Sequence, residues 1–129
     1  MADATASLGE VNYAATLKSG RHVFTCDEPV SRGGQDAGPA PYDLLAGSLA
    51  ACTAITLRMY AERKQWPLGS VEVDVRFTRL PDKASLIERV LRLGGVLTDE
   101  QRTRLADIAE RTPVTLTLKT GVEIRTRLE

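Results

Sequence analysis

The chain has 129 residues, with 17 Lys or Arg, 17 Asp or Glu, two Cys and one His. This length suits one domain with a modest core, so residues 1–129 are expected to form a single domain. The balanced charge predicts neither a nucleic-acid partner nor binding to an anionic membrane. The N-terminal residues lack the basic start and apolar run of a signal peptide. We therefore expect a cytoplasmic protein with reduced thiols and, since no Cys/His cluster has ligand spacing, with no metal or cofactor.

The first predicted elements are the two strands of a hairpin. Apolar residues alternate with polar or small ones from Val11 to Leu17, which predicts a half-buried strand. Ser19-Gly20 predicts a turn, and residues 21–26 would return as the second strand. A loop rich in Gly and Pro follows over residues 27–40, and loops of this length are more often functional than idle.

A long helix is predicted from Pro41 to about Lys64, because Pro suits a first helical turn and a second Pro follows at position 67. Its apolar run, Leu44 to Leu57, is too short to span a bilayer. The helix is apolar nearly all round, which predicts burial on every side. Small residues would let another helix approach closely: Ala46, Gly47, Ala50, Ala51 and Ala54. We expect the same helix of a second subunit to cover this surface in a homodimer. The alternative is cover by the second helix and loop 27–40 within one chain.

Further hairpins are predicted on both sides of a second helix. Strict alternation predicts a strand over residues 71–78, and residues 86–93 are its expected antiparallel partner. Thr98 and Gln101 have capping-box form and begin the second helix.

Two more strands are expected after Pro113, which closes that helix, over residues 114–118 and 122–128. The resulting order is ββ-α-ββ-α-ββ, an α+β domain built from antiparallel hairpins.

The stretch from Gly38 to Leu68 is GPAPYDLLAGSLAACTAITLRMYAERKQWPL. It closely resembles the central-helix signature of the OsmC/Ohr family, the osmotically inducible protein C and organic hydroperoxide resistance proteins. The element order matches along nearly the whole chain, including CDEPVSRGG before the helix. The resemblance implies antiparallel sheets wrapped around central helices in an intertwined homodimer, with active sites at the subunit interface. It also implies reduction of organic hydroperoxides by a reactive cysteine, with a resolving cysteine, an arginine and a glutamate.

Carried over to this chain, the resemblance places the reactive cysteine at Cys52 and the arginine at Arg21. The resolving cysteine is replaced by Thr112, so this chain resembles a subgroup that lacks the second cysteine. The glutamate position falls at Tyr42, and Asp43 beside it points about 100° away around the helix.

Thiol chemistry explains what these residues would do. A thiolate attacks one peroxide oxygen and becomes a sulfenic acid, and an alcohol leaves. Arg21, from either subunit, would favour the thiolate and hold a peroxide oxygen. Leu45 and Leu49 share roughly the face of Cys52 and suit an apolar hydroperoxide, as they would suit an ordinary core. Without a thiol at Thr112, an external dihydrolipoyl or small thiol has to resolve the sulfenic acid.

The sequence is compatible with three functions. The chain is a thiol-dependent hydroperoxide reductase acting through Cys52, a non-enzymatic dimer that binds a small apolar ligand, or a redox sensor. In the second case Cys52 only lines the pocket, and Thr112 is an ordinary core-facing threonine. The corresponding structural roles are a solvated charge for Arg21, packing for Tyr42 and helix-dipole complementation for Asp43. The reaction rate of Cys52 with alkylating reagents near pH 7 separates reactive from packed thiols.

Overall fold

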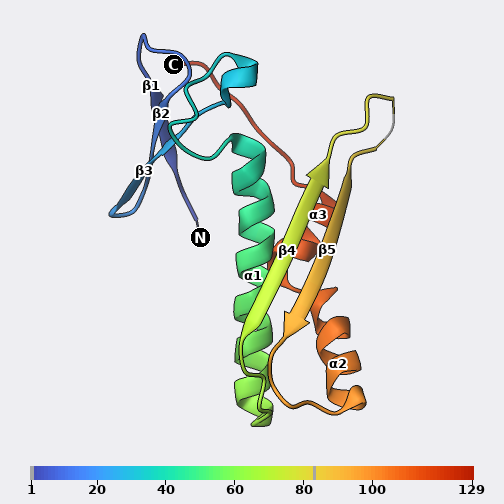
Figure 1. Cartoon of the computed structure of the whole chain (residues 1–129). Helices are drawn as coiled ribbons and strands as arrows, with labels where there is room; N and C mark the ends of the chain where they lie inside the picture. The colour runs from blue at the N-terminus through green and yellow to red at the C-terminus, as the bar shows by residue number, and fades with distance from the viewer. Residues whose placement is uncertain (1, 83) are drawn as a thin grey trace. The chain divides into compact units, whose positions relative to one another are not determined.

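The computed structural model describes residues 2–82 and 84–129. The described residues form two compact units, one ending at Leu45 and the other running from Ala46 to Glu129 (Figure 1).

The first unit contains a three-stranded antiparallel sheet of β1 (Thr5–Leu8), β2 (Ala15–Ser19) and β3 (His22–Cys26), in that spatial order. The predicted hairpin is thus confirmed, and Gly20 takes a positive φ of 58° in its turn. The predicted strand start at Val11 is wrong, because residues 9–14 connect β1 to β2. Ala15 begins β2 because it pairs with the last residue of β1 on one side and the last residue of β3 on the other.

The loop after β3 is organised around a buried carboxylate. Asp27 is 2% exposed, and its side chain accepts hydrogen bonds from backbone N–H groups that include Glu28 at 2.7 Å, Gln35 at 3.1 Å and Ala37 at 3.1 Å. One short 3₁₀ turn, η1 (Val30–Arg32), lies within the loop. These bonds satisfy the charge that burial removes from water.

Helix α1 (Pro41–Lys64) has the predicted bounds. Its carboxylate at the third helical position, Asp43, accepts a hydrogen bond from the Ala40 N–H at 3.0 Å, as in half of a capping box. The buried residues follow a spacing of four and so form one stripe: Leu49, Thr53, Leu57 and Ala61. By length and composition alone α1 would also pass for a membrane span, a test that core helices of soluble proteins pass as well.

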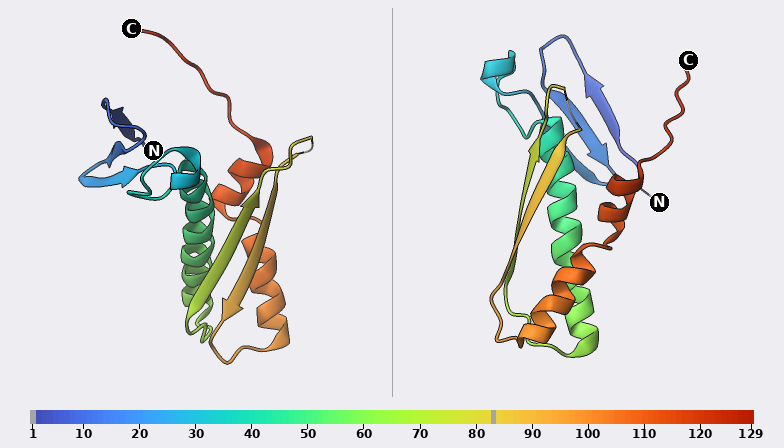
Figure 2. Two further views of the ribbon diagram at one scale, coloured as in Figure 1. Left: turned by 45° about the horizontal axis from the view of Figure 1, so that its top comes forward. Right: turned by 90° about the vertical axis from the view of Figure 1, so that its right-hand side faces the viewer.

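The second unit places helices against one face of a hairpin (Figure 2). Strands β4 (Val71–Thr78) and β5 (Leu86–Leu93) pair antiparallel along their whole length, as predicted. Helix α2 (Asp99–Ala109) begins with the predicted capping box of Thr98 and Gln101. The core cluster joins α1, α2 and the segment before β4: Leu57, Ala61, Leu68, Leu105 and Ala109.

The final predicted hairpin is wrong. Residues Pro113–Thr120 form helix α3, and residues 121–129 have no regular secondary structure. Pro113 at the first helical position fixes a helical φ. Thr115 is buried, and Val114 and Leu118, which are four residues apart and so lie on one face of a helix, are half-buried. The alternation of residues 114–118 fits either period, so the proline decides in favour of the helix.

Candidate functional site

Cys52 lies on the flank of the buried stripe of α1 and is half-buried. Its Sγ atom is 4.0 Å from the Thr56 hydroxyl. Residues four, seven and eleven positions after Cys52 share its face of the helix, namely Thr56, Met59 and Arg63. On this face of α1 the thiol is therefore followed by a hydroxyl, a thioether and a guanidinium.

A groove of about 670 Å³ runs along this same face. It is lined by Thr56, Met59, Glu62, Arg63 and Pro113. Thr56 contacts Cys52 directly, and Pro113 is the first residue of α3. The groove thus combines apolar side chains with one cation and one carboxylate, and Cys52 lies beside it, next to the lining residue Thr56.

Thr112, at the predicted resolving position, is fully buried. It is the N-cap residue of α3, whereas a second helix closed by Pro113 would have ended with it. Its hydroxyl is 2.6 Å from the hydroxyl of Thr115. The position expected for a resolving thiol is thus held by two hydrogen-bonded hydroxyls.

Arg89 is a central residue that the sequence analysis missed. Its side chain is only 13% exposed. The guanidinium donates to the hydroxyls of Thr53 at 3.0 Å and Thr115 at 2.9 Å, and to the carbonyl of Ala109 at 2.9 Å. The carboxylate of Glu110, 3.3 Å away, is its ion-pair partner. Arg89 thereby ties α1, α2 and α3 to β5.

A signal for Arg89 was present in the sequence. Ile87, Arg89, Leu91 and Leu93 alternate with exposed residues along β5, so an arginine stands at an inward position. We call Arg89, Thr53, Thr112 and Thr115 the Arg89 cluster. It fills the region around the resolving position with hydroxyls and one guanidinium.

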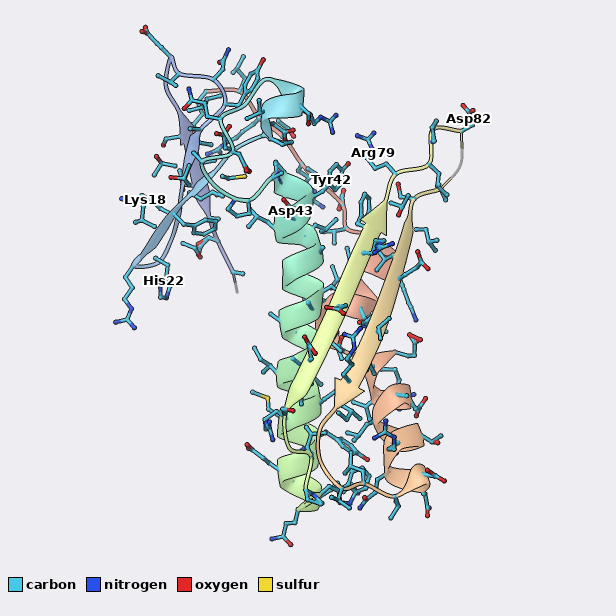
Figure 3. All side chains as sticks on the ribbon, viewed as in Figure 1. Lys18, His22, Tyr42, Asp43, Arg79 and Asp82 are labelled. Carbon is cyan, nitrogen blue, oxygen red and sulfur yellow. The ribbon has the colours of Figure 1, made fainter. Side chains whose placement is uncertain are left out.

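The other predicted site residues divide between the two units. Arg21 is exposed in the β2–β3 turn, and Tyr42 and Asp43 are exposed at the start of α1, where Figure 3 labels them. Leu45 is half-buried at the end of the first unit, whereas Leu49 is buried on the same helix as Cys52. The structure brings Leu49 and Cys52 together on α1; the roles of the first-unit residues stay predictions.

Cys26, the second thiol, is buried at the end of β3 with 6% exposure. Burial raises its pKa above the ordinary value, and the negative charges of Glu28, Asp27 and Asp43 raise it further. A thiol with a raised pKa is a slow nucleophile near neutral pH.

Comparison with known proteins gives one family. The family model described as OsmC-like protein matches residues 33–127. No curated protein matches the chain in sequence.

Three solved structures illustrate the likeness of fold. An OsmC-like protein from Mycoplasma pneumoniae is 22% identical with a TM-score of 0.80, over 92% of this chain and 87% of that one. An organic hydroperoxide resistance protein OsmC from Legionella pneumophila is 22% identical with a TM-score of 0.67, over 92% and 89%. An organic hydroperoxide resistance protein from Elizabethkingia anophelis is 24% identical with a TM-score of 0.69, over 95% and 91%.

These matches confirm the predicted α+β class and the resemblance drawn from the helix sequence. The fold is that of a soluble protein, in which α1 is a core helix rather than a membrane span. With its family model covering most of the residues, the chain belongs to the OsmC-like protein family.

Proposed function

We propose that this protein is a thiol-dependent peroxidase that reduces organic hydroperoxides through Cys52. The observation that carries the proposal is the position of Cys52, half-buried on α1 beside a groove that combines apolar side chains with one cation and one carboxylate. The names of the Legionella and Elizabethkingia proteins, both organic hydroperoxide resistance proteins, support the substrate class.

The proposed reaction has three steps. The Cys52 thiolate attacks one oxygen of the hydroperoxide, the O–O bond breaks, and the alkoxide takes a proton to leave as an alcohol. An external thiol then attacks the sulfenic acid, forming a mixed disulfide and water. A second thiol attacks the mixed disulfide, which regenerates Cys52 and releases the oxidised reductant. Dihydrolipoyl or small cytoplasmic thiols are the proposed reductants.

An external thiol is required because this chain offers no suitable internal one. Thr112 is a hydroxyl in a closed hydrogen bond, and the Cys26 thiol is buried with a raised pKa. In this proposal Arg21, from the same or the partner subunit, holds the peroxide oxygen. Tyr42, Asp43, Leu45 and Leu49 complete the pocket.

A homodimer is part of the proposal. The face of α1 away from the buried stripe is exposed at small or apolar residues, including Gly47, Ala51, Ile55 and Met59. Burying that face against a second copy would remove apolar surface from water, and the small residues permit close helix approach. The same argument applies to Val122, Ile124 and Leu128 in the C-terminal segment, which are 68%, 86% and 99% exposed.

The test is consumption of cumene hydroperoxide with dihydrolipoamide or a monothiol as reductant. Cys52→Ser should abolish turnover, since the nucleophile is gone. Cys26→Ser is the matched control and should retain it. Turnover that survives in Cys52→Ser, or is lost in Cys26→Ser alone, would show that the reaction does not depend on Cys52 in this way.

The Arg89 cluster favours one second candidate, a redox sensor. The cluster holds hydroxyls where a resolving thiol would stand, so oxidised Cys52 would persist. A sensor would form the sulfenic acid readily and turn over slowly with either reductant. Trapping the sulfenic acid with a dimedone probe, alongside the turnover rate, distinguishes the two. A Cys52 thiol that neither forms sulfenic acid nor reacts with iodoacetamide at pH 7 would leave only a ligand-binding role.

A further inference from the structure

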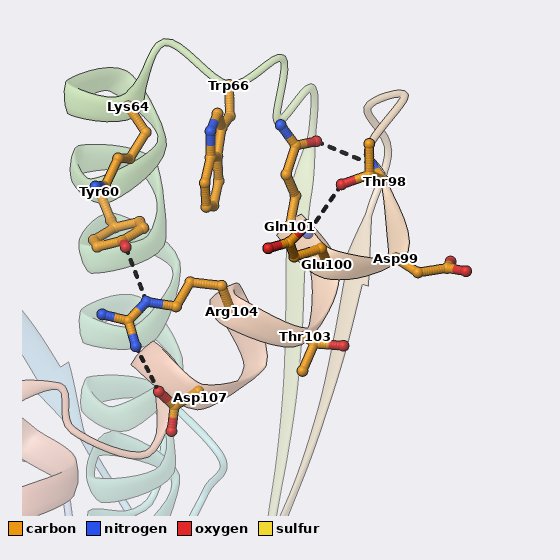
Figure 4. Close-up of a pocket in the computed structure, with 10 residues that line it drawn as sticks. All are labelled: Tyr60, Lys64, Trp66, Thr98, Asp99, Glu100, Gln101, Thr103, Arg104 and Asp107. Carbon is orange, nitrogen blue, oxygen red and sulfur yellow. Dashed lines mark hydrogen bonds and ion pairs between the residues drawn. The ribbon is translucent and has the colours of Figure 1, made fainter.

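A second groove, separate from that beside Cys52, lies at the C-terminal end of α1 (Figure 4). It has a volume of about 1050 Å³ and shares no lining residue with the first groove. One wall comes from the last turns of α1 and from Trp66, and the other from the first turns of α2. Nothing in the proposed peroxidase reaction uses this place.

Two aromatic side chains form the apolar part of the first wall. The rings of Tyr60 and Trp66 are 5.6 Å apart between centroids, at 69°, an edge-to-face arrangement. Both residues are half-buried. Their ring surfaces suit a flat apolar group, because aromatic rings pack favourably in stacked or edge-to-face contact.

Positive charge gathers around the same tyrosine. The Lys64 ammonium and the Arg104 guanidinium each lie 5.8 Å from the centre of the Tyr60 ring, and Arg63 lies 6.0 Å away. The Nε of Arg104 also donates to the Tyr60 hydroxyl at 3.0 Å. The Arg104 charge is partly matched by Asp107, which Arg111 engages as well. No carboxylate pairs with the Lys64 ammonium among the described residues.

Two donors on this wall have no partner within the part of the chain that the structure describes. The Lys64 ammonium makes no hydrogen bond or ion pair there, and its contact is with the Tyr60 ring. The indole N–H of Trp66 likewise has no protein acceptor there and is open to solvent, so a ligand can reach it. A carboxylate accepts hydrogen bonds from both kinds of donor and supplies a negative charge to pair with the Lys64 ammonium.

The opposite wall fixes the orientation of a ligand. The carboxylates of Asp99 and Glu100 stand in the first turn of α2, where they complement the helix dipole. They would repel an anion on their side of the groove. An anionic group is therefore directed toward Lys64, and the flat body of the ligand toward the centre.

We propose that this groove binds a small aromatic carboxylate, with its ring against Tyr60 and Trp66 and its carboxylate between the Lys64 ammonium and the Trp66 indole N–H. The site is independent of Cys52. It would give the protein a ligand-binding function in addition to the thiol chemistry.

Trp66 is the only tryptophan of the chain, so its fluorescence reports directly on the site. The full-length protein is titrated with 4-hydroxybenzoate and with the neutral 4-hydroxybenzamide. Saturable change is expected with the carboxylate, and about tenfold weaker binding with the amide, because a charge-assisted hydrogen bond is lost. Equal affinity for the two compounds, or no saturable change, would overturn the proposal.

Variants locate the binding. Lys64→Gln should weaken the carboxylate about tenfold. Lys119→Gln, which removes a surface lysine paired with Glu110 outside the groove, should leave affinity unchanged. Trp66→Phe keeps a ring but removes the donor, and calorimetry should show weaker binding there as well. The proposal fails if Lys119→Gln weakens binding as much as Lys64→Gln. Unchanged binding in Cys52→Ser is expected and keeps this test separate from that of the peroxidase.

Discussion

Asp27 stabilises the loop before α1 only while it is a carboxylate. Burial by itself would raise its pKa, but backbone N–H donors, first those of Ala37, Gln35 and Glu28, hold the pKa below its usual value. A group whose pKa is lowered in the folded state contributes stability above its unfolded pKa, about 3.9 for Asp. That contribution is lost as the pH falls through the folded pKa.

The free energy of unfolding should therefore decrease below about pH 4, and Asp27→Asn should remove part of this dependence. Urea unfolding of both proteins between pH 7 and pH 3 measures the effect. The gap between wild type and Asp27→Asn should narrow at low pH, whereas Asp36→Asn, at an exposed carboxylate in the same loop, should track wild type throughout. A gap that stays constant with pH would contradict this account.

Arg89 and Arg92 lie on the same strand but face opposite ways. Removing Arg89 takes a charged donor from the hydroxyls of Thr53 and Thr115 and leaves the Ala109 carbonyl with the longer bond from the Thr115 hydroxyl, at 3.3 Å. Arg89→Met should therefore lower the free energy of unfolding by about 2–3 kcal/mol. Arg92 is 53% exposed and pairs with Asp74 at the surface, so Arg92→Met should cost less than about 1 kcal/mol. Denaturant titration compares the two. Similar losses for both variants would argue against the Arg89 cluster as a structural link.

At the scale of elements, α2 depends on its first turn. The Thr98 hydroxyl accepts from the Gln101 N–H at 3.1 Å, and the Gln101 side chain accepts from the Thr98 N–H at 2.9 Å. Thr98→Ala should cost about 1 kcal/mol in the free energy of unfolding, since a helix-end donor loses its acceptor. Thr103→Ala, at an exposed position inside the same helix, should be neutral or slightly stabilising. Equal effects at the two threonines would mean that the cap does not contribute.

Elements with one strong local signal were predicted with correct bounds. Strict alternation located β4, and prolines on both sides located α1. Helix α3 was missed because alternating Val, Thr and Leu satisfy the strand period and, over one turn, the helical period too. Strand β1 was missed because four exposed residues carry no apolar pattern, and only pairing with β2 makes them a strand.

At the scale of the whole molecule, the exposed face of α1 predicts self-association. Ile55 is 54% exposed, so Ile55→Glu should not disturb the chain's own core. In a dimer that buries this face it would place a charge in an apolar interface, at a cost of several kcal/mol. Sedimentation velocity at micromolar concentration should show twice the chain mass for wild type and the chain mass for Ile55→Glu. Val96→Glu, at a 91% exposed loop residue, should remain dimeric. A monomeric wild type would contradict the prediction.

The central helix, the β4–β5 hairpin, the capped start of α2 and the likeness to the OsmC/Ohr family could all be predicted from the amino-acid sequence. Each of these rests on a pattern within about 30 neighbouring residues, where local sterics and hydrophobic periodicity act. The inward position of Arg89 and the hydrogen bond between the hydroxyls of Thr112 and Thr115 could not be predicted in this way. The contacts of Arg89 join residues 20 to 36 positions apart, and the threonine pair depends on the turn into α3. Periodicity records which face of an element is buried, but not which distant partner satisfies a polar group there. That assignment follows from the packing of α1, α2 and α3 against one face of the hairpin.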